Sequence, residues 1–128
     1  MSSPQSILYL EDHEDTRDFV TFLLSRAGYD VCAVSTIQEA RNVLRPQGIK
    51  PEGLVPALCI LDSLLIDGSG LEFCRELRLS HPDTSTLFLS GSVSAEDQAR
   101  AREAGAVEFL KKPVNASVLL AAVAKFLG

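Results

Sequence analysis

The sequence predicts an α/β fold in which a parallel sheet of five strands is covered by helices on both faces. Short apolar runs alternate along the chain with longer segments of helical period. Three of the five runs are apolar throughout, which is typical of central parallel strands that are buried on both faces. Because crossovers between parallel strands are right-handed, these observations predict a doubly wound (βα)5 sandwich.

The five predicted strands are three to five residues long and rich in aliphatic or aromatic side chains. They cover residues 7–10, 30–34, 58–61, 87–89 and 107–110. The first, third and fourth strands are wholly apolar, whereas the second carries Asp30 and the fifth carries Glu108. We therefore expect the second and fifth strands to lie at the edges of the sheet.

Five segments with helical spacing of apolar residues separate and follow these strands. They cover residues 14–26, 37–44, 71–81, 95–104 and 116–127. The stripe expected to face the sheet from the first helix is Phe19, Val20, Leu23, Leu24 and Ala27. Gly28 and Gly105 are suited to ending the first and fourth helices, and Pro82 ends the third. Ser94, with Asp97 three positions later, resembles a capping box that opens the fourth helix.

Composition narrows the class of protein. The chain has 128 residues, of which 46% are hydrophobic and 23% charged, so we expect residues 1–128 to form a single domain with an ordinary core. Seventeen acidic residues against twelve basic ones give a net charge of -5. That charge repels phosphate backbones and anionic lipid surfaces, which argues against direct binding to nucleic acid or a membrane.

Cysteine usage and hydropathy predict a cytoplasmic location. The three cysteines are odd in number and widely spaced, so they form neither a disulfide framework nor a metal-binding pair. No window approaches the roughly 20 apolar residues that a membrane span requires. The first residues also lack the basic and apolar regions of a signal peptide.

Polar residues follow the buried strands at the point where each strand ends. Glu11 and Asp12 come after the first strand, Asp62 after the third, Ser90 after the fourth and Lys112 just after the fifth. Ligands of open parallel sheets bind at the carboxyl ends of the strands. We therefore expect three carboxylates, a hydroxyl and an ammonium group to converge on one rim of the sheet.

This set of groups suits a phosphoryl site. Crowded carboxylates repel one another unless a cation lies among them, and a cluster of hard oxygen atoms suits Mg²⁺. Bound Mg²⁺ keeps positions open for phosphate oxygens, while a lysine and a hydroxyl take the remaining phosphoryl charge. A carboxylate can itself be the nucleophile and form an aspartyl phosphate. Asp62, which follows a wholly apolar strand, is the candidate nucleophile.

Four motifs in this order resemble the response-regulator receiver domain of two-component signalling. They are Glu11-Asp12, Leu61-Asp62 with Gly70 eight positions later, Leu89-Ser90-Gly91 and Lys112-Pro113. The resemblance covers essentially the whole chain, so residues 1–128 are expected to be a single receiver domain. It also implies the strand order 2-1-3-4-5 of the chemotaxis receiver.

The resemblance implies a role for each matching residue. Asp62 is expected to be the phosphoacceptor, with Glu11 and Asp12 as metal-binding acids, the Leu64 backbone carbonyl as a further ligand of Mg²⁺, Lys112 as the phosphate contact, Ser90 as the switch hydroxyl and Phe109 as the switch aromatic. Mg²⁺ is the only cofactor that it implies.

The resemblance also implies a function. A phosphoryl group passes to Asp62 from a sensor histidine kinase or a histidine phosphotransfer protein, and the added charge draws in Ser90 and lets Phe109 move. A downstream effector protein or output domain then reads the fourth helix, the fifth strand and the fifth helix. Such a domain promotes its own phosphorylation and dephosphorylation but has no separate turnover substrate, so it is not counted as an enzyme. Dimerisation on phosphorylation is left open.

Two other functions fit parts of this pattern less well. A degenerate receiver keeps the fold as a phosphorylation-independent interaction module, but the joint presence of the acidic pair, Asp62, Ser90 and Lys112 argues against it. A phosphatase of the haloacid-dehalogenase type needs an acid two residues after its nucleophile, where this chain has Leu64.

Three positions bear on the details of the site. Ile66 stands four residues after Asp62, where the family usually has proline. Leu64 and Ser92 occupy the two positions that influence hydrolysis in this family. Because Leu64 has no polar group to orient an attacking water, we expect slow hydrolysis of the phosphoryl group.

Overall fold

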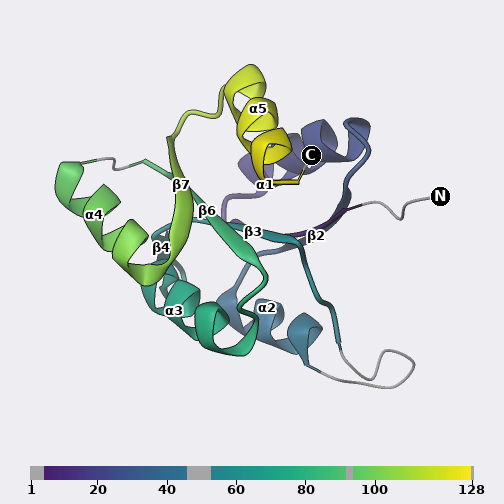
Figure 1. Cartoon of the computed structure of the whole chain (residues 1–128). Coiled ribbons are helices and arrows are strands. Elements are labelled where there is room, and N and C mark those ends of the chain that lie inside the picture. Colours follow the sequence, from purple (N-terminus) through teal and green to yellow (C-terminus); the bar gives the residue numbers. More distant parts are fainter. Residues whose placement is uncertain (1–4, 46–52, 92–93, 128) are drawn as a thin grey trace.

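The structure, a computed structural model, describes residues 5–45, 53–91 and 94–127 and contains a five-stranded parallel sheet (Figure 1). The strands of this sheet are β1 (Ser6–Leu10), β2 (Asp30–Val34), β3 (Leu58–Leu61), β6 (Ser85–Ser90) and β7 (Ala106–Lys111). Their spatial order is β2-β1-β3-β6-β7. Counted along the chain within this sheet, the order is 2-1-3-4-5, which confirms the expected topology. The two strands with a charged residue, β2 and β7, lie at the edges as predicted.

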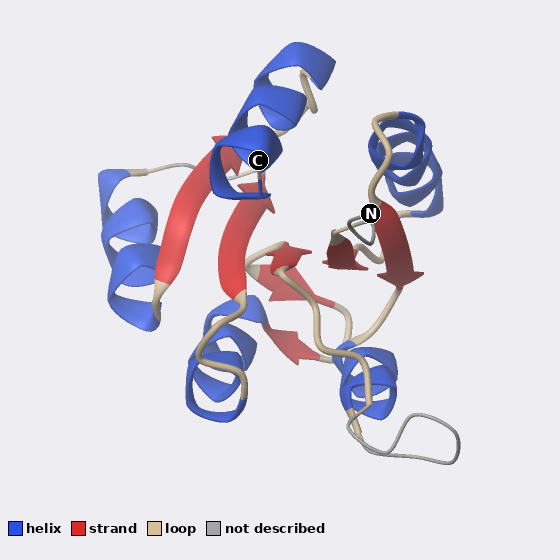
Figure 2. Ribbon diagram, turned by 45° about the vertical axis from the view of Figure 1, so that its right-hand side comes forward, coloured by secondary structure: helices blue, strands red, loops and turns tan. Residues whose placement is uncertain are grey.

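Helices cover both faces of the sheet (Figure 2). They are α1 (Glu14–Arg26), α2 (Ile37–Leu44), α3 (Gly70–Ser80), α4 (Ala95–Ala104) and α5 (Ala116–Leu127). In Figure 1, α1 and α5 lie on one side of the sheet, with α2 and α3 on the other and α4 beside β7. Among the described residues, no helix combines the length and apolar character that crossing a membrane requires.

Two buried clusters, one on each face, explain why β1 is apolar throughout. Leu8 and Leu10 pack in the cluster that includes residues of α2, α3 and α4. Ile7 and Tyr9 pack in the opposite cluster with residues of α1 and α5. Successive side chains of a strand point to opposite faces, so a strand covered on both sides needs apolar residues at every position.

The helix boundaries follow local chemistry. The Ser94 hydroxyl accepts a hydrogen bond of 3.1 Å from the Asp97 backbone N–H, as expected of the residue that caps α4. Gly105 ends that helix at a φ of 113°, a conformation in which glycine carries no Cβ penalty. The third helix begins at Gly70 and ends at Ser80, one residue earlier at each end than predicted.

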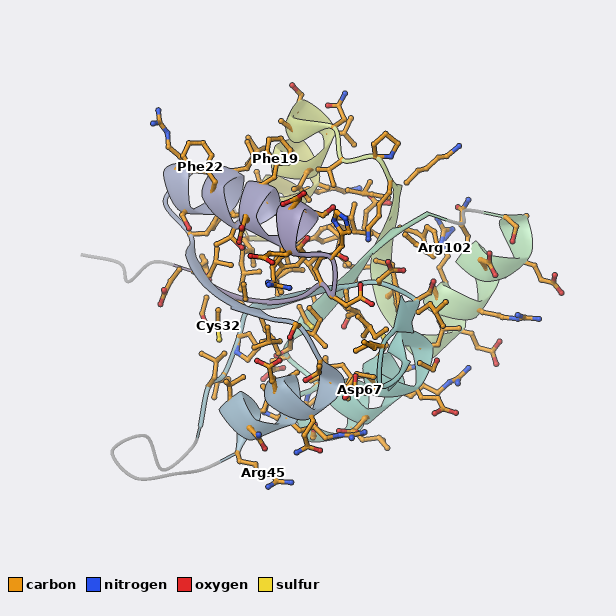
Figure 3. The ribbon with its side chains drawn as sticks, turned by 180° about the vertical axis from the view of Figure 1, so that it is seen from behind. Phe19, Phe22, Cys32, Arg45, Asp67 and Arg102 are labelled. Carbon is orange, nitrogen blue, oxygen red and sulfur yellow. The ribbon has the colours of Figure 1, made fainter. Side chains whose placement is uncertain are left out.

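The predicted buried stripe of α1 is wrong for Phe19 and Ala27. Val20 and Leu24 are fully buried, but 47% of Phe19 is exposed and Ala27 is exposed too. Phe19 precedes Val20 by about 100° around the helix, which turns its ring away from the sheet (Figure 3). The helix therefore buries a narrower stripe than its apolar residues suggest.

A short antiparallel hairpin after β3 is absent from the sequence prediction. It consists of β4 (Leu64–Leu65) and β5 (Gly68–Ser69). Its turn residue Asp67 accepts hydrogen bonds from the backbone N–H groups of Ile37 and Gln38, at 2.9 and 3.0 Å (Figure 3). The hairpin is thereby fixed to the N-terminus of α2, where a carboxylate also complements the helix dipole.

Replacing Asp67 by alanine is expected to lower the free energy of unfolding by about 1 kcal/mol, the usual value of a helix cap. The hydrogen bonds from Ile37 and Gln38 hold the pKa of the Asp67 carboxyl below its ordinary value. Its contribution is therefore present above the ordinary pKa and is lost as the pH falls through the lowered one. Urea unfolding at pH 7 and in strong acid measures this, and equal stability of wild type and variant at pH 7 would contradict it. Exposed Asp83 provides the control substitution, Asp83→Ala.

Candidate functional site

The carboxyl ends of the three central strands and of β7 meet at one edge of the sheet. Glu11 follows β1, Asp62 follows β3 and Ser90 is the last residue of β6. Lys112 directly follows β7, and its backbone N–H donates a hydrogen bond of 2.8 Å to the Ser90 carbonyl. The parallel register thus brings together residues that are up to 101 positions apart in the chain, from Glu11 to Lys112.

The Lys112 ammonium joins two carboxylates at this edge. Its Nζ lies 2.7 Å from Glu11 Oε1 and 2.9 Å from Asp62 Oδ2. Burial by itself lowers the pKa of Lys112, but the hydrogen bonds and charges of Glu11 and Asp62 outweigh that effect. The pKa of Lys112 therefore lies above its ordinary value, and the side chain is a cation at neutral pH. Asp62, placed after an apolar strand, has the charged partner that its position requires.

Glu11 is almost completely buried, with 1% of its surface exposed. Besides Lys112, it accepts a hydrogen bond of 3.2 Å from the His13 backbone N–H and one of 3.5 Å from the Tyr9 hydroxyl. Burial and the neighbouring Glu11 carboxylate raise the pKa of Tyr9, so this phenol stays a donor. The Arg17 guanidinium donates to the Glu11 carbonyl at 2.9 Å. These contacts hold the buried carboxylate in a fixed position.

The other oxygen of Asp62 faces a residue that the sequence analysis did not select. Asp62 Oδ1 lies 3.5 Å from Ser63 Oγ and 3.4 Å from the Leu64 backbone N. Ser63 Oγ in turn lies 3.0 Å from Ser90 Oγ. Ser90, the expected switch residue, is buried, with 2% of its surface exposed. A hydroxyl directly after the predicted phosphoacceptor was the only signal in the sequence that pointed to Ser63.

The structure does not bring all three expected carboxylates together. Glu11 and Asp62 share Lys112, whereas Asp12 is exposed in the bend that follows Glu11. Within the described ranges, no group of three or more His, Cys, Asp or Glu side chains is arranged to hold a metal ion. The side chain of Leu64 is 78% exposed, and the role of its carbonyl stays a prediction. Ser92 lies outside the described residues.

The donor set nevertheless fits Mg²⁺. This ion prefers oxygen ligands, keeps several water molecules and is usually held by only one or two carboxylates. Asp62 is part-buried at the rim with 15% of its side chain exposed, and Asp12 lies at the same end of β1. A site of this kind requires no closed cage of protein ligands.

Phe109 lies on the edge strand β7, next to the site. Its ring stacks on Phe88 of β6 at a centroid distance of 5.9 Å, and it is partly buried against the core. The packing agrees with an ordinary core residue, and the proposed movement of Phe109 stays a prediction.

Comparison with known proteins supports one family. The chain is 31% identical over 113 residues to the response regulator PilR of Pseudomonas aeruginosa, which covers 88% of this chain and 24% of PilR. Other curated relatives are transcriptional regulatory proteins, and this chain spans about half of their length.

Two solved structures show the same fold. One is the BeF3-activated receiver domain of DrrB, a Thermotoga maritima response regulator, with a TM-score of 0.84, 27% identity and 97% coverage of both chains. The other is a Burkholderia pseudomallei response regulator solved with a phosphorylated aspartic acid, a calcium ion and citrate. Its TM-score is 0.79 at 27% identity, covering 92% of this chain and 65% of that one.

The family model of the response regulator receiver domain matches residues 7–124. That range contains all of the sheet except Ser6, the first residue of β1, and every residue of the rim described above. The chain therefore belongs to the response regulator receiver domain family.

Proposed function

We propose that this receiver domain accepts a phosphoryl group on Asp62 in a Mg²⁺-dependent reaction. The observation that carries the proposal is the Asp62 carboxylate at the end of a central strand, 2.9 Å from the Lys112 ammonium. The Burkholderia relative, whose structure holds a phosphorylated aspartic acid and a calcium ion, supports the same chemistry. The donor would be the phosphohistidine of a sensor histidine kinase or of a phosphotransfer protein.

The proposed reaction is an in-line displacement at phosphorus. An Asp62 carboxylate oxygen forms the new P–O bond, the P–N bond of the phosphohistidine breaks, and the departing imidazole keeps the electron pair and takes a proton from water. Lys112 balances the negative charge of the transferring group, so catalysis is mainly positioning and electrostatics. The residues that would hold Mg²⁺, which supplies further positive charge, are Asp12, Asp62, Glu11 and the Leu64 carbonyl. The domain would thus act on itself, without a separate turnover substrate.

The phosphoryl group would act as a switch. It adds a charge of about -1.5 to -2 and new acceptor oxygens beside Ser90. Movement of Ser90 and Phe109 would then change the surface formed by α4, β7 and α5, which an effector protein or output domain reads. Val107 of β7 and Val118 of α5 are exposed large hydrophobic residues on these elements. Phosphorylation-dependent dimerisation would use this same surface.

The remaining parts of the proposal rest on composition and packing. The described residues share one large sheet, which supports a single receiver domain over residues 1–128. The net charge of -5 argues against direct contact with nucleic acid or an anionic membrane. A cytoplasmic location agrees with the three cysteines, which form no disulfide, and with the kinase as donor.

Intact mass after incubation with acetyl phosphate tests the proposal. The wild type is expected to gain one phosphoryl group in the presence of Mg²⁺ and none after chelation, and Asp62→Asn is expected to gain none. Asp83→Asn, which changes an exposed acid, is the matched control. An adduct on Asp62→Asn would place the acceptor elsewhere. A folded wild type that neither gains the adduct nor binds Mg²⁺ would favour the phosphorylation-independent interaction module.

The apolar side chain of Leu64 predicts a long-lived phosphoryl group. No polar atom of this side chain can orient water toward Asp62, and 78% of the residue is open to solvent. Leu64→Asn is expected to shorten the half-life by about twofold to tenfold, the value of one neutral hydrogen bond. Loss of the mass adduct with time measures this. A wild-type half-life of seconds without a phosphatase, or an unchanged half-life in the variant, would contradict it.

A further inference from the structure

Ser63 connects the proposed phosphoacceptor to the proposed switch residue. Its hydroxyl lies 3.0 Å from Ser90 Oγ and 3.5 Å from Asp62 Oδ1. The position of Ser63 is fixed by its backbone, because its carbonyl accepts a hydrogen bond of 3.0 Å from the Gly70 N–H at the start of α3. In this arrangement the hydroxyl lies within reach of both groups.

The hydrogen bonds that connect Asp62, Ser63 and Ser90 have a preferred direction from donor to acceptor. The Asp62 carboxylate is only an acceptor, whereas each serine hydroxyl has one proton to donate. A hydrogen bond to a charged acceptor is stronger than one between neutral groups, so the Ser63 proton favours Asp62. Ser90 then donates its own proton to Ser63 Oγ. While it does so, Ser90 has no proton to offer to a phosphoryl oxygen.

We propose that Ser63 is a positioning residue that competes with the phosphoryl group for the Ser90 hydroxyl. Ser63 thereby stabilises the unphosphorylated arrangement of the switch and lowers the affinity of the site for a phosphoryl group. The inference rests on the proposed function, because it concerns the same Asp62 site. It assigns to Ser63 a role exerted through Ser90, without a direct contact to the transferring group.

Binding of beryllofluoride in the presence of Mg²⁺ tests this role, with the Phe109 amide followed by NMR. Ser63→Ala is expected to tighten binding by about twofold to tenfold, because one neutral hydrogen bond no longer competes. Ser63→Thr retains a hydroxyl and is expected to restore an affinity near that of the wild type. Urea unfolding of each variant shows that the compared proteins are folded.

A double-mutant cycle separates this role from a general structural effect. In a Ser90→Ala background, Ser63→Ala is expected to leave the affinity unchanged, since the competing donor is gone. Weaker binding by Ser63→Ala would show that Ser63 contacts the phosphoryl group directly and would overturn the inference. An unchanged affinity in Ser63→Ala, or the same gain in both backgrounds, would overturn it as well. A folded wild type that binds no beryllofluoride would instead refute the proposed function and the inference with it.

Discussion

Phosphorylation of Asp62 is expected to slow by at least about a hundredfold when Lys112 is replaced by methionine. The variant keeps a long, unbranched side chain but removes the ammonium that lies 2.9 Å from Asp62 Oδ2. Negative charge that collects on the transferring group then has no fixed cation from the protein. The rate of adduct formation with acetyl phosphate and Mg²⁺, measured by intact mass, gives the result directly.

The adjacent lysine offers a matched control for this substitution. Lys111 is exposed and ends β7, so Lys111→Met changes the net charge by the same amount outside the site. It is expected to keep the wild-type rate within about twofold, since exposed charges are largely screened. Equal slowing in both variants would show that net charge, rather than the contact with Asp62, controls the reaction.

Lys112→Met is also expected to reduce stability, because Glu11 is buried and loses its cation. The cost of leaving a buried charge without its partner is about 3–5 kcal/mol. The raised pKa of Lys112 sets the pH dependence of this contribution in the wild type. The stability contributed by the Lys112 ammonium is fully present below the ordinary pKa of lysine. It is lost only as the pH rises through the raised pKa of Lys112. Urea unfolding near neutral pH therefore measures its full size.

The rim could be predicted from the sequence because a parallel sheet brings together the ends of its strands. Glu11, Asp62, Ser90 and Lys112 each stand at the end of an apolar run, and the strand order makes all four of these ends consecutive along the sheet. The ends of a helix could also be predicted from the sequence where a capping residue or a glycine defines them, as for α4 between Ser94 and Gly105. In these cases, one local feature decides the structure.

Other features depend on contacts that no local pattern contains. The hairpin of β4 and β5 has strands of two residues, too short for any periodicity, and Asp67 finds its partners 29 and 30 positions away on α2. Asp12 is exposed although it neighbours the buried Glu11. Phe19 is apolar yet exposed, because α1 buries a narrow stripe. Orientation at the rim thus depends on tertiary packing, which overrides residue type.

Gly70→Ala is expected to cost at least about 3 kcal/mol of stability, at or above the upper end of ordinary overpacking. A Cβ at Gly70 would lie 1.8 Å from the Asp62 carbonyl oxygen and 2.9 Å from its carbonyl carbon. Both obstacles are backbone atoms, so no side chain can turn aside to make room. Urea unfolding measures the loss, and Gly91→Ala, where a Cβ meets nothing within 4 Å, is the control.

The same contact predicts a selective effect on the site. Gly70 starts α3 and its N–H holds the Ser63 carbonyl, so relief of the clash must displace the segment that carries Asp62. In conditions where Gly70→Ala is still folded, phosphorylation of Asp62 is expected to fall by at least about a hundredfold, because misplacement by about 1 Å has this cost. Near wild-type stability and adduct formation in the variant would show that the helix start can move without Asp62. Gly70 would then only allow α3 to pack closely, and this close approach would not position the phosphoacceptor Asp62.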